Sequence, residues 1–247
     1  MAAPRAIAAD AHRAVLVRAR HLPSCLVDGL GCPVVLARHP AWQRSRHRVL
    51  FLGQETARWP IPGARTLREC LALSDPVAAL ADAYAAFDYG VAAPRVHFIR
   101  ALRRVERELE DGVRGAVAWS NVGRIYCAPM GRTSASVIGL PRAMRNTVLA
   151  WQRGLLAAEI AALRPRAAFF LCGPKYDEAL AAEFAGLHLR PVGDVPLRGL
   201  ARLVHPVLPL ASFRTHHPRT LEINKLPYLA SLIELARAEA GAADGPR

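Results

Sequence analysis

A carboxylate, a carboxamide and an imidazole each follow an apolar run of the sequence. Glu55, Asn121 and His217 come shortly after segments whose length and composition are typical of buried strands. Open α/β sheets bind their ligands at the carboxyl ends of strands, so these side chains are candidates for one site. A carboxylate can orient water or support a cationic sugar, an amide can read the edge of a base, and a histidine can donate to the oxygen of a departing base. The set favours cleavage of the bond between a base and a sugar.

Two other chemistries fit the sequence less well. A nucleophilic hydrolase would need a serine or cysteine at a sharp strand-to-helix turn, and the sequence contains no GxSxG motif. A nucleotide-binding ATPase or kinase would need a glycine-rich phosphate loop, and neither the Walker A spacing nor GxGxxG follows the first apolar run. A hydrolase of small nucleosides or nucleotides stays open, because the same polar groups could act on a free ligand.

Four apolar segments predict the strands that would position these groups. The sequence between successive segments is long enough for helical crossovers, so parallel pairing with right-handed connections would bring their polar ends to one edge of the sheet. The predicted strands cover residues 49–52, 115–119 and 167–172 and the segment around residues 200–212.

Helical periodicity and capping residues predict the crossovers. Asp75 followed by Pro76 is typical of an N-cap and a first helical residue. We expect one domain over residues 1–247, with residues 1–45 as an extension packed on the core and residues 241–247 as a flexible tail. The predicted helices cover residues 76–87, 96–110, 142–163 and 176–184, and a C-terminal segment from Thr220 or Leu226 to Glu239.

Composition indicates a polyanionic partner. The formal net charge is +13 and the sequence pI is about 10.7, and neutralising phosphates favours binding to nucleic acid. The alternative is a compositional bias, because arginines supply almost all of the positive charge. The cysteines lack metal-site spacing, so we expect reduced core thiols, no metal and no cofactor. The N-terminal segment lacks the apolar run of a signal peptide. We therefore expect a cytoplasmic monomer that does not enter membranes.

The order of the motifs resembles the uracil-DNA glycosylase superfamily. In that family a GQDPY-like motif follows the first strand, an asparagine ends the next strand, an apolar strand ends in glycine, and an HPSPL-like loop precedes the last helix. The resemblance implies a three-layer α/β/α sandwich around a mostly parallel four-stranded sheet and a DNA glycosylase that flips its target base. The corresponding residues are Gly53-Gln54-Glu55-Thr56-Ala57, Trp119-Ser120-Asn121, Phe170-Leu171-Cys172-Gly173 and His217-Pro218-Arg219-Thr220-Leu221.

The resemblance also implies roles for individual residues. Glu55 would position the attacking water and His217 would act as the electrophile, while Leu221 would wedge into the duplex. A non-catalytic nucleic-acid binder of the same fold is the alternative. We expect Gln54, Trp59, Ser120 and Asn121 to bind the base, and Arg214 and Arg219 to contact DNA phosphates.

Several positions depart from the family pattern or leave alternatives open. Glu55 replaces an aspartate, and Thr56-Ala57 replaces a Pro-Tyr pair whose tyrosine helps to exclude thymine. His205 and His216 compete with His217 for the same role. Trp59 could stack on a base or fill the core.

Overall fold

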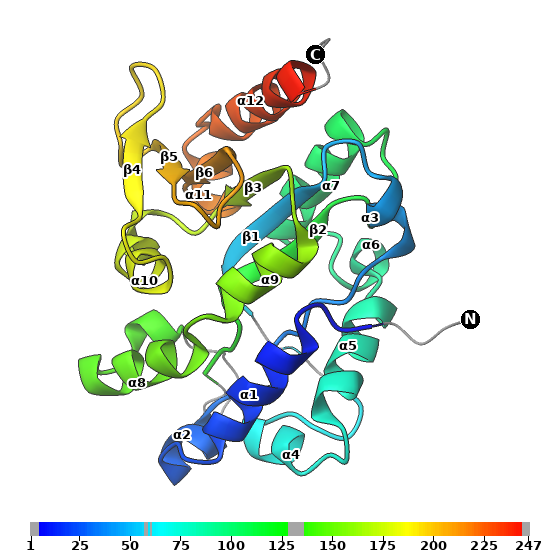
Figure 1. Cartoon of the computed structure of the whole chain (residues 1–247), viewed down its shortest axis with the longest axis vertical. Coiled ribbons are helices and arrows are strands. Elements are labelled where there is room, and N and C mark those ends of the chain that lie inside the picture. Colours follow the sequence, from blue (N-terminus) through cyan, green and yellow to red (C-terminus); the bar gives the residue numbers. More distant parts are fainter. Residues whose placement is uncertain (1–4, 57–58, 60, 128–135, 244–247) are drawn as a thin grey trace. The chain divides into compact units, whose positions relative to one another are not determined.

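The computed structural model (Figure 1) describes residues 5–56, 59, 61–127 and 136–243. The chain divides into two compact units. Each unit is assembled from segments that are separate in sequence, and each is described here by itself. The single domain expected from the sequence stays a prediction. Unit 1 comprises Met1–Arg38, Glu55–Phe87 and Gly123–Ala162, and unit 2 comprises His39–Gln54, Asp88–Val122 and Leu163–Arg247.

Unit 2 contains the sheet, and the α/β class expected from the sequence is confirmed. The strand order is β2-β1-β3-β6-β5-β4. β1 pairs in parallel with β3, and β3 with β6, whereas β5 is antiparallel to both β6 and β4. Only the last residues of β1 and β2 belong to unit 1. The strands are β1 (Val49–Glu55), β2 (Ala118–Gly123), β3 (Ala167–Phe170), β4 (His188–Pro191), β5 (Leu200–Val204) and β6 (Ala211–Thr215).

The sheet is six-stranded and mixed, which corrects the expectation of four mostly parallel strands. The segment around residues 200–212 forms two strands, β5 and β6, joined by a turn. Pro206 and Pro209 lie in that turn, and proline lacks the N–H that a continuous central strand would need. β4 adds an edge strand whose residues are mostly exposed, and its sequence contains no continuous apolar run.

Helix α7 (His97–Leu109) confirms the helix expected over residues 96–110 and packs on the sheet of unit 2. Its Phe98 ring lies 5.0 Å from Phe51 and 6.3 Å from Trp119, measured between ring centroids. α12 (Tyr228–Ala243) contacts both α7 and β6, and α11 (Pro218–Ile223) contacts α7. α12 ends at Ala243, beyond Glu239, where the sequence suggested that the helix fades. Unit 2 also contains α3 (Pro40–Arg44), α6 (Tyr89–Ala92) and α10 (Asp177–Glu183).

Unit 1 is helical, and α5 (Pro76–Ala86) begins as expected, with the Asp75 side chain accepting from the Ala78 N–H at 3.0 Å. The single helix expected over residues 142–163 is wrong. It is divided into α8 (Arg142–Gln152) and α9 (Leu155–Leu163) because Gly154 adopts a left-handed φ of 85°. The N-terminal segment forms α1 (Ala9–Ala19) and α2 (Ser24–Gly29), and α4 (Leu67–Leu71) precedes α5.

Candidate active site

The carboxyl ends of β1, β3 and β6 meet at one edge of the sheet in unit 2. The Leu171 N–H donates to the Leu52 carbonyl at 2.7 Å, and the Gly173 N–H donates to the Thr215 carbonyl at 2.9 Å. The Gln54 side chain crosses from β1 and donates through Nε2 to the Cys172 carbonyl at 2.8 Å. The positions expected for a ligand-binding edge are thus held together by backbone and side-chain hydrogen bonds.

Asn121 lies against Gly53 in unit 2 and is 6% exposed. A Cβ atom placed on Gly53 would lie 2.4 Å from Asn121 Oδ1 and 2.8 Å from the Phe98 ring. The missing side chain of Gly53 therefore makes room for an amide from β2 and an aromatic ring from α7. Asn121 is a residue of β2, although the sequence suggested that it follows the strand.

Gly53→Ala should displace Asn121 and Phe98, because the new Cβ atom would lie closer to both side chains than Cβ atoms lie to their neighbours in real proteins. Overpacking of this kind typically costs about 1–3 kcal/mol in the free energy of unfolding. Urea denaturation would measure the cost. Gly29→Ala is the matched control, since a Cβ there would meet nothing within 4 Å. Equal stability of the two variants would contradict the close approach.

His217 caps α11, and its hydrogen bond fixes which ring nitrogen carries the proton. Nδ1 accepts from the Arg219 N–H at 3.2 Å, so in the neutral ring the proton lies on Nε2. Burial, together with electrostatic repulsion from His97, Lys175 and Arg219, lowers the pKa of His217 to about 4. At neutral pH His217 is therefore an uncharged imidazole with an Nε2–H to donate.

The lowered pKa of His217 predicts a loss of stability in mild acid. Between about pH 6.5 and about pH 4 the unfolded chain binds a proton at His217 that the folded chain does not bind. The free energy of unfolding should therefore fall as pH decreases through this window. Urea denaturation at pH 7 and pH 5 would measure the fall. It should be smaller in His217→Gln, and an identical fall in both proteins would contradict the assignment.

The two competing histidines differ in position. His205 follows β5, which is antiparallel to β6, so it lies at the opposite end of the strands from His217. Its Nε2 pairs with the Ala185 carbonyl at 3.1 Å, and its ring lies 5.4 Å from that of Phe184. His216 directly precedes His217, and burial also lowers its pKa. This geometry favours His217 over His205.

Glu55 belongs to unit 1, where its carboxylate caps the short 3₁₀ turn η1 (Val137–Gly139). Oε1 accepts from Ser136 Oγ at 3.0 Å and from the Ile138 N–H at 3.2 Å, and Oε2 accepts from the Val137 N–H at 2.8 Å. Three donors from one turn fix the orientation of this side chain. The convergence of Glu55 with Asn121 and His217 stays a prediction.

Trp59 and Ser120 are both buried. Trp59 is 5% exposed, and its ring centroid lies 5.1 Å from that of Phe87 and 6.5 Å from that of Tyr84, within unit 1. This packing favours the core-filling alternative over stacking on a base. Ser120 is fully buried in β2, and as the strand neighbour of Asn121 it points to the opposite face of the sheet.

Two of the three residues expected to touch DNA are enclosed in the protein, which corrects those predictions. Arg214 is 1% exposed, pairs with Asp177 at 2.9 Å and donates to the carbonyls of Leu197 and Arg198. Its guanidinium is therefore not available to a phosphate. Leu221 is 5% exposed, so it does not project as a wedge. Arg219 is exposed on the first turn of α11, and its contact with DNA stays a prediction.

Three further residues of unit 2 belong to this edge although the sequence did not single them out. The Phe98 ring and Asn121 both approach Gly53, whereas Lys175 and His97 both contribute to the lowered pKa of His217. His97 Nδ1 is 2.8 Å from Glu222 Oε2, which joins the first turn of α7 to α11. The motif Gly173-Pro174-Lys175 could have revealed Lys175, because it follows a predicted strand. Phe98 gave no signal beyond an apolar position on a helix.

No protein-family model matches the chain, and no curated protein matches it. Among the described residues, no group of three or more histidine, cysteine, aspartate or glutamate side chains could hold a metal ion. In the same part of the chain, no helix is both long enough and apolar enough to cross a membrane.

Proposed function

We propose that this protein is a uracil-DNA glycosylase-like enzyme that hydrolyses the N-glycosidic bond of a deaminated or damaged base flipped out of DNA. The observation that carries the proposal is the neutral His217, with Nε2–H as its remaining donor, at the edge of the sheet that also holds Gln54 and Lys175. β2, β1, β3 and β6 would form the family's four-stranded core in an α/β/α sandwich, and β4 and β5 would be an added hairpin.

A neutral imidazole suits the departure of a base. When the bond between the sugar and the base breaks, negative charge develops on the base, often on a carbonyl oxygen. A donor already aimed at that oxygen stabilises the charge without reorganising, and this kind of help is commonly the largest single contribution to catalysis. Lys175 and Arg219 lower the pKa of His217, and the same positive charge would also stabilise an anionic leaving base.

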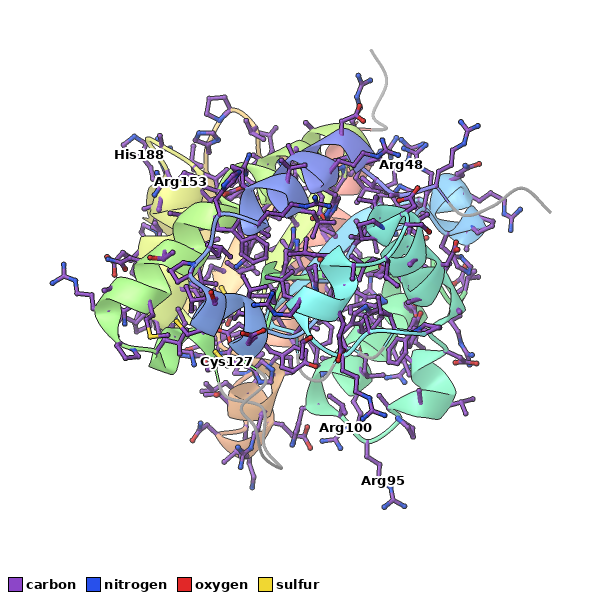
Figure 2. The ribbon with its side chains drawn as sticks, turned by 90° about the horizontal axis from the view of Figure 1, so that it is seen from below. Arg48, Arg95, Arg100, Cys127, Arg153 and His188 are labelled. Atoms are coloured by element: carbon purple, nitrogen blue, oxygen red, sulfur yellow. The ribbon has the colours of Figure 1, made fainter. Side chains whose placement is uncertain are left out.

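Asn121 and Phe98 would recognise the extruded base. A carboxamide offers both a donor and an acceptor, which matches the mixed edge of a base, and an adjacent ring offers a surface for stacking. The close approach of both side chains to Gly53 would place them together. Exposed arginines would hold the DNA backbone. Arg95, beside the start of α7, extends away from the ribbon in Figure 2, and Arg219 is exposed on α11.

Glu55 would supply the negative charge that orients water and supports the cationic sugar. Its longer side chain, compared with the aspartate of the family, is held by the turn at Ser136–Ile138. Residue 57, which occupies the position of the tyrosine that helps to exclude thymine in the family, lies outside the described residues.

A lesion panel tests the proposal. The protein would be incubated with single- and double-stranded oligonucleotides carrying uracil, hypoxanthine or xanthine, and abasic sites would be detected by alkaline cleavage. We expect at least one base to be released, with the reaction strongly slowed in His217→Ala. Binding without release of any base would replace this proposal with the non-catalytic binder. Release of bases from free nucleosides alone would favour the small-molecule hydrolase.

A further inference from the structure

Two fully buried cysteines of unit 1 converge on one backbone carbonyl. Cys32 Sγ lies 3.6 Å from the Thr66 oxygen, and the Cys70 backbone N–H donates to the same oxygen at 3.0 Å. An isolated bridge between Gly31 and Thr66, and the bond from the Leu67 N–H to the Leu30 carbonyl at 2.8 Å, align the two segments. The chain after α2 is thus fixed beside the first turn of α4.

The two thiols also differ in character. A hydrogen bond from Cys32 lowers the pKa of the Cys70 thiol, while the same contact and burial raise the pKa of Cys32. Cys70 is therefore the better nucleophile of the pair, since the thiolate is the reactive form. All five cysteines are reduced in the structure.

We propose that Cys32 and Cys70 form a dithiol that closes to a disulfide when it meets a small-molecule disulfide oxidant. Local opening of α4 would expose Cys70, whose thiolate attacks the oxidant and releases one thiol. Cys32 then loses its proton and attacks the mixed disulfide, which releases the second thiol. Two S–H bonds of the protein are replaced by one S–S bond, and two electrons and two protons pass to the oxidant.

The disulfide would link the chain after α2 to α4, both in unit 1. The segment that carries Cys32 is also bonded on its other side, where the Gly31 N–H donates to the Tyr126 carbonyl at 2.9 Å and Leu30 bridges Cys127. The closed loop would contain all of β1. A cross-link that restricts so long a loop in the unfolded chain stabilises the folded state.

Oxidation of the full-length protein tests this inference. After incubation with oxidised glutathione and alkylation of free thiols, peptide mapping should find Cys32 linked to Cys70. The melting temperature should rise by about 5–10 °C and return after reduction with dithiothreitol. A map without this link, or a link without a rise in melting temperature, would overturn the proposal.

Matched variants separate the pair from the other thiols. Cys25 is exposed and should be glutathionylated, so Cys25→Ser should remove that adduct and keep the rise in melting temperature. Cys32→Ser and Cys70→Ser should each abolish the rise. A rise that survives either of these two substitutions would contradict the assignment. If either variant does not fold, the peptide map of the wild-type protein still decides the question.

Discussion

Replacing His217 by alanine should slow base release by about 10²- to 10³-fold, which is the usual effect of removing one donor to a developing oxyanion. The effect should appear in the chemical step, because the Nε2–H of a neutral His217 is most useful once charge has moved onto the base. Single-turnover rates on the lesion found in the panel would measure it. Affinity for the lesion DNA should change much less than the rate.

His205→Ala is the matched control for this experiment. It removes the other histidine that precedes a proline, but His205 lies at the opposite end of the strands, beside Phe184. We expect His205→Ala to retain the wild-type rate. A large loss in His205→Ala, or none in His217→Ala, would contradict the assignment of the electrophile.

The lowered pKa of His217 also predicts how the rate of base release depends on pH. The imidazole stays neutral from about pH 5 upward, so its donor is present throughout the physiological range. The rate that depends on His217 should therefore not fall between pH 6 and pH 8. A decline centred near pH 6.5 would indicate that the protonated ring is the active form.

The positions of the central strands could be predicted from the sequence, but the number of strands in the sheet could not. β1 and β3 lie where apolar runs predict them, because a strand buried on both faces reads as a continuous hydrophobic run. The hairpin of β4 and β5 could not be predicted in the same way. β4 is exposed, so it lacks the apolar run of a buried strand. Only a short proline-containing turn separates β5 from β6, so hydrophobicity alone predicts a single segment there.

Side-chain orientation explains the errors at the candidate site. Arg214 precedes the His217 motif, which suggested contact with phosphates, and Leu221 ends the motif, where the family resemblance implied a wedge, yet both side chains are buried. Burial of an arginine depends on a partner distant in sequence, here Asp177, and no local pattern reveals such a pair. Gly53 was visible in the sequence, but its role required knowing that an amide from β2 and a ring from α7 approach it.

Replacing Glu55 by glutamine should lower the rate of base release by about 10²- to 10⁴-fold, the range typical of positioned acid–base help. The substitution removes the charge proposed to orient water and to support a cationic sugar, while the base-binding groups are unchanged. Binding of lesion DNA, measured by fluorescence anisotropy, should therefore be nearly that of the wild type. Single-turnover kinetics would measure the rate.

The control must separate the charge of Glu55 from its cap on the turn at Ser136–Ile138. In Glu55→Gln an amide NH₂ would face an N–H donor, which leaves groups unsatisfied and costs about 1–3 kcal/mol of stability. Ser136→Ala also removes a hydrogen bond from this cap but keeps the carboxylate. If the charge acts in catalysis, Glu55→Gln should lose far more rate than Ser136→Ala after both rates are corrected for the folded fraction at the assay temperature. If the corrected rates of both variants stay near that of the wild type, Glu55 serves only to hold the turn, and the water-positioning role is wrong.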